Sequence, residues 1–147
     1  MSKTITDPVM GKLSWDDSDW AGDVSLSSRK KTTLHISAPE ETEEIPDALR
    51  ERFSWIIAND KRLRLAVAER MRGDVWSENE EDQNLPAEAF AERLAAENID
   101  ILSAPKPSEE GDTDFTIWYD DDMLYGGHVL ISDFTKKGEL LRVEVHG

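Results

Sequence analysis

The sequence predicts an α+β domain, with an antiparallel β-sheet of about six or seven strands and a central block of about three helices packed on it. Three observations lead to this fold class. Segments near the N-terminus alternate between apolar and polar residues, the middle third follows a helical period, and apolar strand-like runs return near the C-terminus. Strands and helices that are segregated along a chain are typical of α+β folds. The length of 147 residues fits one domain, so residues 1–147 are predicted to fold as a single unit.

The N-terminal part is expected to form a β-meander over residues 9–37. Apolar or β-branched residues alternate there with polar ones, as in strands that bury one face. Clusters of Asp, Ser and Lys between the segments are typical of turns, because short polar side chains hydrogen-bond to the nearby backbone. The expected strands are Val9–Trp15, Trp20–Leu26 and Thr32–Ser37, with turns at Asp16–Asp19 and Ser27–Lys30.

The helical block is expected over residues 45–97. Pro46 suits the first turn of a helix, where its missing N–H group costs nothing. Asn59 and Asp60 interrupt the apolar stripe of this first helix and can cap a second one. A third helix is expected to begin at Leu85 and to end at Asn98, since Leu85, Phe90 and Leu94 share one face.

The C-terminal part, residues 99–146, is expected to return to strands. The run Phe115–Tyr119 is rich in aromatic and β-branched residues, which favour strands. Residues 136–138 suit a hairpin turn, and residues 105–112 suit a loop. The expected strands are Ile99–Leu102, Phe115–Tyr119, His128–Ser132 and Leu140–His146.

Charge and composition limit the possible partners. The chain carries 32 acidic and 17 basic residues, for a formal net charge of −15. It would repel nucleic acid and an acidic membrane surface, whereas a basic protein partner is favoured. The segment Arg50–Arg72 is the exception with a net charge of +4, and its basic side chains are expected to form ion pairs with the acidic body. The chain has no cysteine and no signal-peptide-like start, so a cytoplasmic location is expected.

The C-terminal half carries a set of motifs that is similar to a known family. They are Trp76, Leu85–Phe90 with Arg93-Leu94, Phe115–Asp122, Leu124–His128 and the closing strand to Gly147. The opening segments Asp7–Leu13 and Trp20–Gly22 also match. The chain resembles the bacterial family called domain of unknown function 2262, but has Gly126 where members often carry a bulky aromatic. The resemblance implies a fold, a bacterial origin and an accessory role, including a role as an immunity protein, and it implies no established activity.

Two turns combine acidic and aromatic residues, and both are candidate partner-binding sites. Aromatic side chains often anchor protein interfaces, and carboxylates would attract a basic partner. The simpler alternative is that both are ordinary turns whose aromatic side chains belong to the core. The candidate residues are Trp15, Asp16, Asp17, Asp19 and Trp20 in the first turn, and Asp120, Asp121, Asp122, Tyr125 and His128 in the second.

The second turn is also a candidate metal site. Carboxylates and an imidazole are common ligands of divalent cations, which makes Asp120, Asp122, His128 and Asp133 the candidate ligands. Their spacing matches no EF-hand loop, and adjacent residues of an extended strand point to opposite faces. The alternative is an acidic turn in which His128 is hydrogen-bonded at the start of a strand.

The sequence therefore favours a protein-binding module, immunity- or antitoxin-like, with no catalytic residues and no cofactor. No Cys nucleophile, Gly-x-Ser-x-Gly elbow or phosphate-binding loop is present in the sequence. Two alternatives remain open: a metal-assisted enzyme that uses Asp120, Asp122 and His128, and a structural domain without a site of its own.

Overall fold

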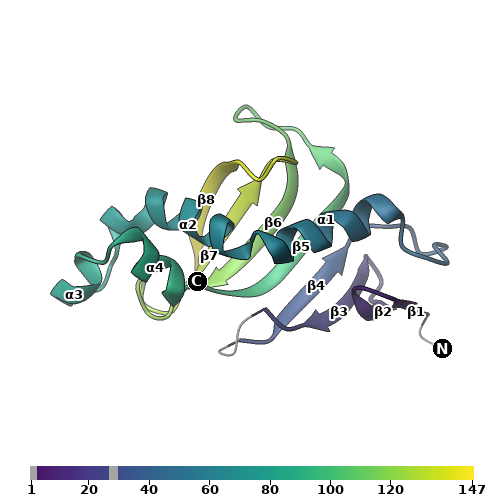
Figure 1. The fold of residues 1–147 in the computed structure, drawn as a ribbon, viewed down its shortest axis with the longest axis horizontal. Coiled ribbons are helices and arrows are strands. Elements are labelled where there is room, and N and C mark those ends of the chain that lie inside the picture. Colours follow the sequence, from purple (N-terminus) through teal and green to yellow (C-terminus); the bar gives the residue numbers. More distant parts are fainter. Residues whose placement is uncertain (1–2, 27–29) are drawn as a thin grey trace.

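The computed structural model describes residues 3–26 and 30–147, and these form one β-sheet with helices across one face (Figure 1). The eight described strands stand in the sheet in their order along the chain. They are β1 (Thr4–Asp7), β2 (Gly11–Trp15), β3 (Trp20–Val24), β4 (Thr32–Ile36), β5 (Ala95–Lys106), β6 (Thr113–Asp120), β7 (Val129–Phe134) and β8 (Leu140–His146).

The helices connect the two halves of the sheet. Every described strand pair is antiparallel except β4 and β5, which are parallel. A parallel pair needs a long crossover connection, because the chain must return to the starting end of the sheet. That crossover contains α1 (Asp47–Ala58), α2 (Asp60–Met71), the short 3₁₀ helix η1 (Arg72–Asp74), α3 (Glu80–Gln83) and α4 (Ala87–Arg93).

The core lies between the helices and the covered face of the sheet. In β6 the side chains of Phe115, Ile117 and Tyr119 are buried, whereas Trp118 between them is 36% exposed. This period-two alternation is expected of an antiparallel sheet with one covered face. The helices contribute apolar residues at helical spacing, which are Leu49, Phe53, Ile56, Leu63, Val67 and Phe90.

The predicted α+β class is confirmed, but the predicted numbers of elements are wrong. The described residues contain eight strands instead of six or seven, and four α-helices instead of three. Strand β1 was missed because it is short and holds a single apolar residue, Ile5. Helix α3 was missed because the segment Glu80–Gln83 has no apolar residue, and it begins where Asn79 Oδ1 accepts a hydrogen bond from the N–H of Glu81 at 2.8 Å.

The third predicted helix is shorter than expected. It ends at Arg93, and Ala95 and Ala96 already belong to β5, where they pair with Asp120 and Tyr119 of β6. Alanine favours helices locally, but pairing with β6 and burial decide the outcome here. Strand β5 also extends beyond the predicted end at Leu102 to Lys106, and so includes the first two residues of the predicted loop 105–112.

Two further expectations concern particular segments. Of the predicted turn Ser27–Lys30, residues 27–29 lie outside the described part of the chain.

In that described part, no helix combines the length and the apolar character that crossing a membrane requires.

Buried ion pairs attach α1 to the sheet. Both Nε and Nη2 of Arg50 donate to Oδ1 of Asp7, at 2.9 and 2.7 Å. The other oxygen of Asp7 accepts hydrogen bonds from the N–H groups of Val9 and Met10, both at 2.9 Å. Arg52, two residues further along α1, contacts the buried Asp114 of β6. The expectation that the basic segment pairs with the acidic body is thus confirmed for these two arginines.

We predict that Asp7→Asn lowers the free energy of unfolding at pH 7 by about 2 kcal/mol, because an amide cannot accept all the hydrogen bonds that this carboxylate accepts. Burial raises the pKa of Asp7, but the bonds from Arg50, Met10 and Val9 outweigh it and hold this pKa below its ordinary value. A carboxylate whose pKa is lowered in the folded protein stabilises the fold at pH values above its ordinary pKa. This stabilisation is lost as the pH falls through the lowered pKa. Urea unfolding between pH 3 and pH 7 should therefore show the difference between the two proteins shrinking below about pH 4.

Asp47→Asn is the matched control, because Asp47 also pairs with Arg50 but its side chain is 87% exposed. Exposed pairs contribute little, so we expect a change within about 0.5 kcal/mol. Equal effects of the two substitutions would contradict the role assigned to Asp7.

Candidate functional site

The loop between β6 and β7 is organised by one buried carboxylate, that of Asp121. Its Oδ2 accepts hydrogen bonds from the N–H groups of Tyr125 at 2.7 Å, His128 at 3.1 Å and Gly127 at 3.2 Å. Its Oδ1 accepts one from Met123 at 3.1 Å. Asp121 is fully buried, so it fixes the loop and is not available to a partner.

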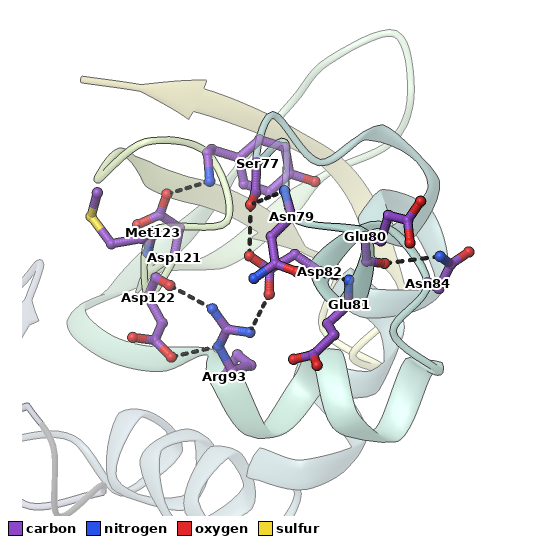
Figure 2. A network of polar contacts seen from close by, with 11 residues as sticks. Ser77, Asn79, Glu80, Glu81, Asp82, Asn84, Arg93, Asp121, Asp122 and Met123 are labelled. Atoms are coloured by element: carbon purple, nitrogen blue, oxygen red, sulfur yellow. Dashed lines mark hydrogen bonds and ion pairs between the residues drawn. The ribbon is translucent and has the colours of Figure 1, made fainter.

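A second contact fixes the same loop from outside. Arg93 of α4 lies between Asp122 and Asp82, as Figure 2 shows. Its Nε is 2.5 Å from Oδ2 of Asp122, its Nη2 donates to the carbonyl of Asp122 at 2.8 Å, and its Nη1 donates to Asp82 at 2.9 Å. The hydrogen bond from Arg93 lowers the pKa of Asp82, with Ser77 as a further donor. The loop is therefore tied to both α4 and the α3 segment.

The backbone of this loop is strained. Asp122 and Met123 have φ angles of 48° and 69°, in the left-handed region that residues with a side chain rarely adopt. Gly126 and Gly127 follow with φ angles of 76° and 86°, where the lack of a side chain removes the penalty. In this conformation Met123 points away from the polar network and is 63% exposed (Figure 2).

An exposed aromatic side chain lies beside the loop. Trp76 is 58% exposed, and its ring centroid lies 5.6 Å from that of Tyr125 and 5.0 Å from that of His128, both edge to face. The backbone N–H group of Trp76 donates to the carbonyl of Leu124 at 2.9 Å. We call the surface formed by Trp76, Met123, Gly126, Gly127 and His128 the Trp76 patch.

Tyr125, a predicted contact residue, lies beneath this patch. It is fully buried, and its hydroxyl donates to the carbonyl of Met71 at 2.8 Å. Burial raises the pKa of Tyr125, and the charges of Asp74 and Asp121 add to the rise. Tyr125 supports Trp76 from below and offers no surface of its own to a partner.

Three of the four candidate metal ligands, the carboxylates, have separate partners, whereas Nδ1 of His128 is buried with no hydrogen-bond partner among the described residues. Asp120 lies 3.8 Å from Lys30 and accepts a hydrogen bond from the backbone of Asp122, whose carboxylate binds Arg93. Asp133 accepts from Thr116 Oγ1 at 2.6 Å and pairs with Arg142 at 3.2 Å. Because Thr116 lies four positions along β6 from Asp120, Asp133 is roughly 13 Å from that end of the strand. The structure does not bring these four side chains together.

The first acidic turn, between β2 and β3, is held by its own side chains. Oδ1 of Asp16 accepts hydrogen bonds from the backbone of Asp19 at 2.9 Å and of Ser18 at 3.3 Å, while Asp17 is exposed with a φ angle of 79°. Trp20 is buried, and its Nε1 donates to the carbonyl of Pro39 at 3.0 Å. Trp15 packs on Trp20 edge to face at 5.6 Å and is half-buried.

One cluster at this turn was not predicted from the sequence. Nδ1 of His35 lies 3.0 Å from Oδ1 of Asp19 and 3.8 Å from Oδ2 of Asp16. Burial lowers the pKa of His35, but the hydrogen bond to Asp19 and the charges of Asp19, Asp100 and Asp16 together raise it above its ordinary value. This contact depends on the β3–β4 register, which pairs Ala21 with His35, and no local spacing encodes that register.

The two acidic turns lie at opposite ends of the strands. Trp20 pairs with Ile36, which pairs with Ile101 of β5, whereas Asp120 at the other turn pairs with Ala95 at the start of β5. Six strand positions separate Ala95 and Ile101, which is roughly 20 Å. The two turns are therefore separate surfaces.

These features define a small α+β domain with a rigid, partly apolar loop at one end of its sheet. The model of a bacterial family described as "Uncharacterized protein conserved in bacteria (DUF2262)" matches residues 7–145, and the chain belongs to this family. No curated protein and no solved structure gave a match to the chain. The resemblance seen in the sequence is thus confirmed, and it covers Trp76 and the whole β6–β7 loop.

We predict that Asp121→Asn releases the β6–β7 loop, because an amide oriented toward these N–H groups leaves at least one of them without an acceptor. Buried unsatisfied groups cost about 1–3 kcal/mol each. Hydrogen exchange should speed up at the amides of Tyr125, Gly127 and His128, and the free energy of unfolding should fall by a comparable amount.

Asp112→Asn is the control, since Asp112 is exposed in the loop between β5 and β6. It should leave both measurements unchanged. Unaltered protection of the three amides in the Asp121 variant would show that another contact holds the loop.

Proposed function

We propose that this chain is a protein-binding module, an acidic accessory protein of the bacterial cytoplasm, and that the Trp76 patch is its contact surface. The exposure of Trp76 and Met123 carries the proposal. At 58% and 63%, they are the most exposed large apolar side chains in the described part of the chain. Tryptophan is enriched among the residues that dominate binding energy at protein interfaces, and methionine adapts its shape to a partner.

The rigidity of the patch supports this function. Asp121 and Arg93 fix the β6–β7 loop through the contacts described above, so that little conformational entropy would be lost on binding. Strained backbone that persists under such support is a feature of functional loops.

The charge around the patch favours a basic partner. The segments 74–84 and 120–128 contain no Lys or Arg, and eight acidic residues lie within them. Arg93 is the cation that reaches the second segment from α4, and it already binds Asp82 and Asp122. Asp121 is buried and Asp120 pairs with Lys30, so the acidic rim of the patch consists of the exposed side chains of Asp74, Glu78, Glu80 and Glu81. An acidic rim of this kind would steer a basic protein surface toward the patch.

An immunity- or antitoxin-like role is the specific form of this proposal. Such a protein acts by covering a functional surface of its partner, and a rigid acidic patch with an aromatic centre is sufficient for that task. The alternative of a metal-assisted enzyme built on Asp120, Asp122 and His128 has less support, because Asp120 and Asp122 bind Lys30 and Arg93.

We predict that Trp76→Ala weakens binding to the partner by about thirty-fold or more, since loss of such an anchor costs about 2 kcal/mol or more. The partner would first be captured from a lysate of the source bacterium at low salt and identified by mass spectrometry. Its dissociation constant would then be measured with purified proteins, and the affinity should fall as salt rises.

Trp118→Ala is the matched control, because Trp118 is also an exposed tryptophan but lies on the open face of the sheet. It should change the affinity less than about two-fold, within the range of energetically neutral contacts. Equal weakening by both substitutions, or an affinity independent of salt, would overturn the assignment of the patch and of its acidic rim.

A further inference from the structure

We propose that Asp16, Asp19 and His35 form a binding site for a divalent transition-metal ion, a site that is separate from the Trp76 patch. The three side chains come from two places in the fold, the β2–β3 turn and the last residue but one of β4. Their ligand atoms, two carboxylate oxygens and one imidazole nitrogen, lie within 4.8 Å of one another. In the described part of the chain, this is the one group of such residues that converges in this way.

The ligand atoms are already oriented toward a common point. Oδ1 of Asp16 is occupied by the N–H groups of the turn, which leaves Oδ2 facing His35. Oδ1 of Asp19 faces the same Nδ1 atom of His35 at 3.0 Å. A metal ion would replace the contact between Asp19 and His35 and draw the three atoms to about 2 Å from itself, the usual distance for zinc bound by nitrogen and oxygen.

The charge balance at this cluster differs from that elsewhere in the molecule. Among the described residues, Arg side chains form ion pairs with five shielded Asp carboxylates, namely Asp7, Asp60, Asp82, Asp114 and Asp133. The carboxylate of Asp121 is held by backbone N–H groups, and that of Asp120 by Lys30. Within residues 3–26 and 30–147, the ion-pair partner of Asp16 and Asp19 is His35 alone. Asp100 of β5, the sheet neighbour of His35, adds a third carboxylate, which accepts a hydrogen bond from Nδ2 of Asn98 at 3.0 Å.

Three carboxylates around one imidazole leave an excess of negative charge when that imidazole is neutral. The cluster is partly shielded from solvent, with side-chain exposures of 40% for Asp16, 26% for Asp19 and 25% for His35. A divalent cation would neutralise this excess and use all three groups as ligands.

The ligand set also indicates the class of metal. Imidazole nitrogen favours zinc and its neighbours among the first-row transition metals over magnesium and calcium. Calcium takes six to eight oxygen ligands, more than this turn supplies. Two carboxylates and one imidazole would leave a coordination position for water, as in zinc sites with three protein ligands.

The test uses the full chain and Zn²⁺ as the probe. Calorimetric titration should show one saturable site, and Mg²⁺ or Ca²⁺ at the same concentration should not compete. His35→Gln and Asp19→Asn should each weaken Zn²⁺ binding at least about ten-fold, since even outer groups of metal sites matter by this factor. Circular dichroism without metal would establish that both variants are folded.

His146→Gln is the matched control, because His146 also lies 3.0 Å from a carboxylate, that of Glu144, but both side chains are more than half exposed. This substitution should leave Zn²⁺ binding unchanged, as should Trp76→Ala at the other end of the sheet. In the unaltered protein, nuclear magnetic resonance should show the ring signals of His35 shifting on addition of Zn²⁺. Binding that persists in the His35 variant, or ring signals that shift only for His146 or His128, would overturn the proposal.

Discussion

The parallel pairing of β4 with β5 is the constraint on which the rest of the structure depends. Seven strand junctions join the described strands, and only this one requires the chain to return to the starting end of the sheet. The helices are that return path, so they lie together on one face and leave the other face open (Figure 1). The same pairing places His35 next to Asp100, and the pairing of β5 with β6 then places the start of β5 next to the β6–β7 loop.

The arginines of an acidic chain have a structural task that follows from this arrangement. Arg50 and Arg52 attach α1 to β1 and β6, while Arg93 attaches α4 to the β6–β7 loop. Breaking a shielded pair is costly because it leaves one charge without compensation. These cations are therefore committed inside the molecule, and the surface around the Trp76 patch remains acidic.

Local sequence patterns were sufficient for the fold class but not for the boundaries or the sites. The helical period of α1 and the apolar alternation of β6 were readable, because burial on one face imposes them. Ala95 and Ala96 were predicted to be helical, because only their pairing with β6, which is distant in sequence, places them in a strand. The family motifs indicated the β6–β7 loop as a candidate site. However, the candidate residues Tyr125 and Asp121 are buried, and Met123 is the exposed side chain of this loop. Exposure depends on backbone angles that residue types do not encode.

The conformation of the β6–β7 loop is more than the connection of two strands requires. A two-residue hairpin could join β6 and β7 without strain in residues that carry side chains. Instead, Asp122 and Met123 adopt positive φ angles, and the side chain of Met123 is exposed to solvent. The carboxylate of Asp121 accepts hydrogen bonds from four backbone N–H groups of the loop. Strain and exposure both oppose folding, whereas the Asp121 and Arg93 contacts hold the loop against them. A loop that served only to connect two strands would need neither the strain nor the exposure, and this is the reason for proposing that the loop binds a partner.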